Sequence, residues 1–134
     1  MTIRVYGLPV PQGRPRAFLP KGATRPSVFD PAGSRDWKRT VQAQALNLCP
    51  RPVPLEGPVR LGLVFFLPRP KSAPRRVTLP CKRPDVDNLA KAVKDALRAI
   101  AWGDDCQVVE LRARKVFASQ AEPPGVLIDV EAVA

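Results

Sequence analysis

The 134-residue chain contains no histidine. This absence excludes Ser-His-Asp and Cys-His catalytic triads, zinc sites with histidine ligands, and nucleases that use histidine as the general base. Cysteine is scarce as well. The three cysteines, Cys49, Cys81 and Cys106, are an odd number and lie far apart, which supports neither a disulfide framework nor a zinc site. Any catalysis must therefore rest on carboxylates, lysine and a bound metal ion.

Long apolar runs are also missing. No segment approaches the roughly 20 consecutive apolar residues that a membrane-spanning helix requires. The stretch from Met1 to Tyr6 lacks the charged and apolar regions of a secretion signal. We therefore expect a cytoplasmic protein. The length and the 45% apolar content suit one domain, residues 1–134, with its own hydrophobic core.

Acidic residues are few, and the charge is strongly one-sided. The chain has 12 acidic and 22 basic residues, a net charge of +10, which favours a polyanionic partner such as nucleic acid. Two irregular segments, Pro9–Phe29 and Pro68–Pro84, contain ten basic residues and no acid. Such segments can follow a phosphate backbone, although a solvated loop is the alternative. The candidate DNA-binding residues are Arg14, Arg16, Lys21, Lys71, Arg75, Arg76, Lys82 and Arg83.

Aromatic residues are only 6% of the chain. Two of them, Phe18 and Phe29, lie in the first basic segment. There they are candidates for stacking on exposed bases at a DNA branch point, and anchoring the loop to the core is the alternative.

The spacing of apolar residues predicts an α+β domain. Apolar and polar residues alternate, as in strands, in residues 2–6, 59–67, 109–114 and 126–133. They recur at helical spacing in residues 34–48, where Ser34 can cap the helix, and in residues 85–101. The order β-α-β-α-β-β predicts a mixed sheet with two main helices packed on it, and we expect the last two strands to form a hairpin. Residues 7–31 and 68–84, rich in Pro, are expected to be long loops.

Five of the twelve acidic residues lie between Asp85 and Asp105. Asp85 and Asp87 begin the second predicted helix, and Asp104 and Asp105 follow its end by a turn, so folding could bring the two pairs together. Carboxylate clusters bind hard divalent cations, and such an ion supports phosphodiester hydrolysis. One interpretation of the pattern is therefore a metal site that hydrolyses phosphodiesters.

A purely structural role for these residues stays open. Asp85 could cap the helix, Asp87 could favour its positive end and pair with Lys91 one turn later, and Asp104 with Asp105 could form a turn. Lys91 could instead stabilise negative charge developing on a phosphate. The residue pattern alone does not choose between these roles.

Several linked motifs resemble the RusA-like crossover junction endodeoxyribonucleases, also called Holliday junction resolvases. Lys82–Lys91, Asp95–Leu97 and Trp102–Val109 are similar to the family's Pro-Asp-x-Asp-Asn, downstream Lys, Asp-Ala-Leu and Asp-Asp-x-Gln-Val pattern, in the same order. Pro11–Arg16 is similar to an early Pro-x-Gly-Arg-Pro-Arg stretch, and Pro70–Ser72 also resembles the family. The resemblance therefore covers most of the domain.

The resemblance implies specific roles. Asp85, Asp87 and Asp105 are the essential metal carboxylates, Lys91 is a supporting catalytic residue near the scissile phosphate, and Asp104 is a further ligand. The ion is Mg²⁺, with Mn²⁺ as a substitute. The protein is a homodimer that nicks two strands of a four-way DNA junction in recombination and repair, leaving 5′-phosphate and 3′-hydroxyl ends. A nucleoid-associated location and a phage or prophage origin suit the family.

Two alternatives differ in class from this interpretation. The first is a basic protein that binds DNA junctions without cutting them, and the second is a less selective metal-dependent nuclease. We expect Asn88 to orient a ligand or cap the helix, and Gln107 to support the site without binding the metal directly.

Overall fold

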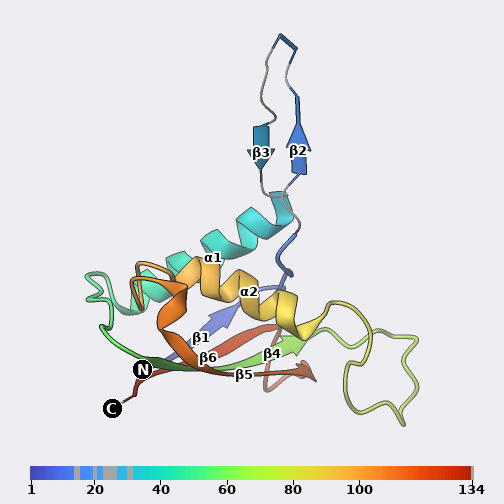
Figure 1. Ribbon diagram of the computed structural model, residues 1–134. Coiled ribbons are helices and arrows are strands. Elements are labelled where there is room, and N and C mark those ends of the chain that lie inside the picture. Colours follow the sequence, from blue (N-terminus) through green and yellow to red (C-terminus); the bar gives the residue numbers. More distant parts are fainter. Residues whose placement is uncertain (14–15, 20, 23–26, 30–31, 134) are drawn as a thin grey trace.

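A computed structural model describes residues 1–13, 16–19, 21–22, 27–29 and 32–133. The larger of two sheets has four strands, and two helices cover one of its faces (Figure 1). This arrangement confirms the predicted α+β fold and the order of its main elements. The elements are β1 (Thr2–Tyr6), β2 (Arg16–Phe18), β3 (Ser27–Phe29), α1 (Ala32–Leu48), β4 (Val59–Leu67), α2 (Val86–Leu97), the 3₁₀ turn η1 (Asp105–Gln107), β5 (Val108–Phe117) and β6 (Gly125–Ala132).

The strand order in the large sheet is β1-β6-β4-β5. β6 is antiparallel to both β1 and β4, whereas β4 and β5 are parallel and are joined through α2. The predicted hairpin of the last two strands is therefore wrong, because β5 and β6 lie on opposite sides of β4. The end of β4, from Phe65 to Leu67, is buried on both faces, and a central position gives this apolar strand hydrogen-bonding neighbours on both edges.

One continuous core lies between the helices and the sheet. Alternate residues of β4 point into it, together with one stripe of each helix and the fully buried Trp102. Fully burying each large side chain of this kind contributes about 1.5–3 kcal/mol. No helix in the described ranges is long and apolar enough to cross a bilayer. The helical core residues are Trp37, Val41, Ala45, Leu89, Ala90, Ala92, Val93, Ala96 and Leu97.

Both predicted helices differ from the structure at one end. α1 begins at Ala32, so Ser34 does not cap it; its side chain is buried, and its hydroxyl accepts a hydrogen bond from the Gly13 N–H at 3.4 Å. α2 ends at Leu97 and not at residue 101. Ala99 adopts a left-handed conformation (φ 67°) and donates its N–H to the Trp102 carbonyl at 2.7 Å. This turn places Trp102 in the core, and burying this side chain stabilises the fold more than another turn of helix would.

The expected loop over residues 7–31 contains regular structure. β2 and β3 form a separate two-stranded antiparallel sheet, in which Arg16 pairs with Phe29, and Figure 1 shows it projecting beyond the start of α1. Each of these strands has only three residues, which is too few for an alternating apolar pattern to be recognised in a segment rich in proline. The candidate residue Arg14, and the side chains of Arg16, Phe18 and Phe29, lie outside the described part.

Candidate metal and nucleic-acid site

Two exposed carboxylates stand at the start of α2. Asp85 occupies the N-cap position in extended conformation, but its side chain makes no capping hydrogen bond. Asp87 Oδ1 accepts only a local hydrogen bond from the Asn88 N–H at 3.0 Å. Among the described residues, neither aspartate forms an ion pair, so the pairing of Asp87 with Lys91 is not observed. Both carboxylates lie at the positive end of the helix dipole, which favours their negative charge. Both are therefore available to bind a cation.

A lysine on β5 holds the chain that leads into Asp85. Lys115 Nζ donates to the carbonyl oxygens of Lys82 and Pro84, each at 2.9 Å. Hydrogen bonds from a charged donor are among the stronger ones in proteins. Because Pro84 directly precedes Asp85, Lys115 fixes the backbone that presents this carboxylate.

Sequence reasoning missed Lys115 because β5 carries many charges. A signal was present, however. Lys115 continues the alternation of Leu111 and Ala113, which pair with the inward-facing Leu61 and Leu63 of β4. The helix-covered face of a strand normally carries apolar residues, so a lysine at this position breaks the pattern. Such a lysine needs carbonyl or carboxylate partners.

The loop between β4 and α2 is folded against the edge of the sheet. Arg69 donates to the carbonyls of Val77 at 2.8 Å and Pro74 at 2.7 Å, and its guanidinium lies 4.8 Å from the centre of the Phe117 ring. One of the six basic residues of this loop is thus used internally. The other five, all exposed, are Lys71, Arg75, Arg76, Lys82 and Arg83. They, together with the exposed Lys21, are the described members of the candidate DNA-binding set.

At the far end of α2, Asp104 and Gln107 form a capping box around η1. The Asp104 carboxylate accepts the Cys106 N–H at 3.2 Å, and this backbone hydrogen bond holds the pKa of Asp104 below its ordinary value. Gln107 Oε1 accepts the N–H groups of Gly103 and Asp104 at 2.8 and 2.9 Å. Its Nε2 donates to the carbonyls of Leu55 and Gly57. Gln107 therefore supports the turn.

Asp105 is half-buried and oriented by one hydrogen bond. Its Oδ1 accepts from Nε1 of Trp102 at 3.0 Å, and Trp102 is itself fully buried. The rigid indole thus fixes the carboxylate. The remaining acid of the cluster, Asp95, forms an ion pair with Lys38 of α1 (3.5 Å) and joins the two helices.

The two pairs of carboxylates lie at opposite ends of α2, as Figure 1 shows for the elements that carry them. Twelve helical residues span about 18 Å. Lys115 contacts Pro84, whereas Asp105 precedes the first residue of β5, and the strand from Val108 to Lys115 covers roughly 23 Å. The expectation that folding joins Asp105 to Asp85 and Asp87 is therefore wrong for a single chain. In the described ranges, no three acidic or cysteine side chains could share one metal ion.

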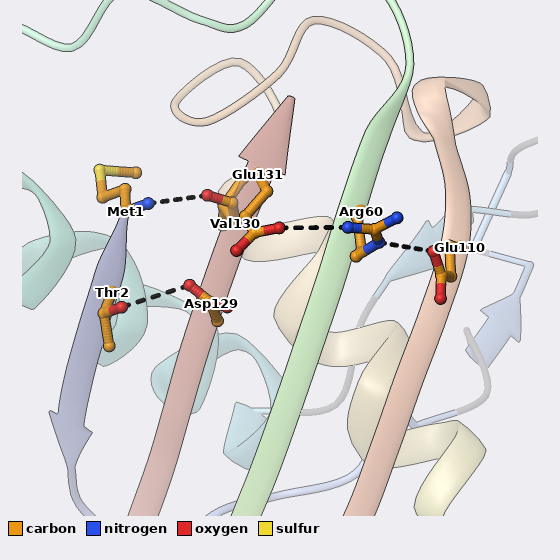
Figure 2. Close-up of polar contacts among 7 residues, drawn as sticks. All are labelled: Met1, Thr2, Arg60, Glu110, Asp129, Val130 and Glu131. Atoms are coloured by element: carbon orange, nitrogen blue, oxygen red, sulfur yellow. Dashed lines mark hydrogen bonds and ion pairs between the residues drawn. The ribbon is translucent and has the colours of Figure 1, made fainter. Parts of the chain in front are cut away.

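Ion pairs neutralise part of the open face of the sheet. Figure 2 shows Arg60 between two acids, with Nε 2.5 Å from Glu110 and Nη1 3.3 Å from Glu131, and it also shows Thr2 donating to Asp129 at 3.2 Å. Arg60 lowers the pKa of Glu110 through this hydrogen bond. Exposed pairs of this kind add little stability. They do neutralise charge locally, so the excess positive charge of the described residues lies elsewhere, notably in the 68–84 loop.

Comparison with known proteins defines the class of the molecule. The family model for endodeoxyribonuclease RusA matches residues 7–131, so the protein is a nuclease of the kind that cuts DNA internally. A Bacillus subtilis (strain 168) protein described as the uncharacterized protein YqaN is 35% identical over 138 residues, covering 96% of this chain and 95% of the relative. The chain belongs to the RusA endodeoxyribonuclease family.

Proposed function

We propose that this protein is a Mg²⁺-dependent endonuclease that resolves Holliday junctions by paired symmetric nicks, in DNA recombination and repair. The observation that carries the proposal is the pair of exposed carboxylates at the start of α2, Asp85 and Asp87, which form no ion pair with a described residue. They directly follow a loop with five exposed basic residues. Carboxylates for a metal ion, set beside cations for a phosphate backbone, are what metal-assisted cleavage of DNA requires.

The donor set fits a hard cation. Asp85, Asp87 and Asp105 offer only carboxylate oxygens, the ligands that Mg²⁺ prefers, and Mn²⁺ accepts the same set. The bound ion would polarise the phosphate and lower the pKa of its water. Asp104 is the further candidate ligand, and one of its oxygens also accepts a hydrogen bond that caps η1.

A complete site of this kind needs two copies of the chain. Asp105 lies a helix length from Asp85 and Asp87, so in a two-fold symmetric homodimer Asp105 of one protomer completes the carboxylate pair of its partner. Symmetry then creates two identical sites. Two sites related by a two-fold axis match the two symmetry-related strands of a four-way junction.

Lys91 supplies a positive charge beside the proposed site. It lies one helical turn after Asp87, is exposed, and forms no ion pair with a described residue. We assign it the stabilisation of charge that develops on the phosphate oxygens during cleavage. The exposed basic residues of the 68–84 loop hold the flanking DNA backbone, and this binding is expected to weaken steeply as salt rises.

The proposal is tested with a labelled four-way junction and a linear duplex of equal length, each incubated with the protein in Mg²⁺ or in EDTA. Paired symmetric nicks in the junction alone, dependent on Mg²⁺, are expected. Equal cutting of both substrates would indicate a less selective nuclease. Tight junction binding without cutting in any divalent ion would indicate a binding protein.

Replacing Lys115 with Met is expected to raise the Mg²⁺ concentration needed for half-maximal cleavage about tenfold or more, the usual effect of losing a group that orients a metal ligand. The reason is that the carbonyls of Lys82 and Pro84 lose the ammonium that holds the backbone before Asp85. Mg²⁺ titrations of cleavage measure the effect. Arg114→Met on the same strand is the charge-matched control, and Lys115→Arg should restore part of the affinity. An equal effect of both Met variants would assign the loss to net charge.

A further inference from the structure

A groove of about 950 Å³ opens beside Asp85. It is lined by the loop between β4 and α2, by the segment from Leu8 to Gln12 and by the start of α2. Its surface is mainly apolar. The residues that give it flat surfaces are Pro9, Pro11, Pro70, Pro74, Pro80 and Phe117.

The walls of this groove are held in place by hydrogen bonds of the protein itself. Arg69 ties the loop to itself and stacks on Phe117, and Lys115 ties the end of the loop to β5. The segment from Leu8 to Gln12 is joined to α2 by the Gln12 N–H, which donates to the Asn88 carbonyl at 2.9 Å. The groove is therefore formed before any ligand arrives, as most ligand sites are.

The chemistry of the groove suits a nucleotide. Apolar flat surfaces match the faces of a nucleobase, and stacking on such surfaces is how proteins hold unpaired bases. Lys82 and Arg83, both exposed, line the groove and supply positive charge for the phosphate, and Asp85 and Asn88 line it too. A volume of about 950 Å³ is in the range of sites that hold one small ligand, and a single nucleotide is of that kind.

We infer that the groove receives one unpaired nucleotide of the DNA substrate, next to the phosphate that is cut. This inference rests on the proposed function, because the position of the groove beside Asp85 places its occupant within one nucleotide of the metal site. A nucleotide in the groove aligns the scissile phosphate with Asp85 and Asp87. The base at this position then determines where along a strand the protein cuts.

The test uses four-way junctions that lack one base, at each position flanking the cut in turn. Wild-type protein is expected to cut one of these junctions about tenfold or more slowly than the intact junction, the effect of losing one stacked base. Ser72 is exposed and lines the groove, so Ser72→Trp places an indole in it. Thr78 is exposed on the same loop but does not line the groove, so Thr78→Trp adds the same side chain outside it. Ser72→Trp should cut the intact junction about tenfold more slowly and be insensitive to base removal, whereas Thr78→Trp should behave as wild type.

The outcomes separate this inference from the proposed function. A wild-type protein that cuts every base-deleted junction as fast as the intact one overturns the groove assignment and leaves the endonuclease intact. If no junction is cut, the affinities of the same junctions in EDTA test the groove alone, and equal affinities reject it. Melting curves and sedimentation check both Trp variants. A changed oligomeric state of Ser72→Trp alone would assign the groove to a second copy of the chain and overturn the inference.

Discussion

Asp87→Asn is expected to reduce junction cleavage more than about 100-fold while junction binding is retained or improved. Loss of a group that merely orients a ligand costs 10–100-fold, so loss of a ligand itself should cost more. Binding improves because the variant removes a negative charge that repels phosphate. Single-turnover cleavage and gel-shift titration on the same junction measure the two effects. Asp36 is another exposed aspartate in a helix, α1, and Asp36→Asn is the matched control.

Thermal melting distinguishes a metal ligand from a structural residue at this position. A ligand that binds only the folded protein stabilises it, so Mg²⁺ should raise the melting temperature of the wild type and of Asp36→Asn. It should raise that of Asp87→Asn less. In the absence of metal, Asp87→Asn should melt at or above the wild-type temperature, since it relieves repulsion between Asp85 and Asp87. A large loss of stability without metal would instead show that Asp87 has a structural role.

Mixing two inactive proteins is expected to restore cleavage. In a homodimer formed from Asp87→Asn and Asp105→Asn chains, one site carries both substitutions and the other carries neither. An equal mixture contains about half mixed dimers, so about a quarter of all sites are intact. The product should be single nicks rather than paired ones. Cleavage by each protein alone and by the re-equilibrated mixture measures the effect.

This mixing experiment depends on where Asp105 lies. If each site were built within one chain, every site in the mixture would carry a substitution and no activity would return. Asp85→Asn mixed with Asp87→Asn is the control, because both substitutions affect the same half of the site. Recovery in that control would mean that Asp85 and Asp87 do not act together.

The main helices and strands could be predicted because each buries one face. The stripe of α2 and the alternation of β4 are visible in the sequence for this reason. The pairing of strands could not be predicted in the same way. The apolar alternation of β5 and β6 fits a hairpin as well as it fits two strands on opposite sides of β4. What decides between them is that the apolar β4 is buried in the centre of the sheet, with a strand paired to each of its edges.

The assignment of Asp85, Asp87 and Asp105 as metal ligands stays a prediction, whereas their arrangement in one chain differs from the expected one. The motif pattern named these residues, yet short separation in sequence suggested closeness in space. The intervening residues form α2, which keeps the two groups apart. Lys115 escaped prediction for a related reason. The alternation of Leu111 and Ala113 indicates its inward orientation, but its carbonyl partners belong to the loop before α2, which the sequence of one strand does not reveal.

The length of α2 sets a mechanical constraint on the whole enzyme. Inserting one residue would rotate everything beyond it by about 100° and turn the stripe that includes Leu89 and Val93 out of the core. Only an added or removed full turn, about 5.4 Å, would approximately preserve the packing. The spacing between the two ends can therefore change in large steps only. In the proposed dimer, this makes the separation of the two cuts a fixed dimension of the fold, which surface mutations cannot adjust gradually.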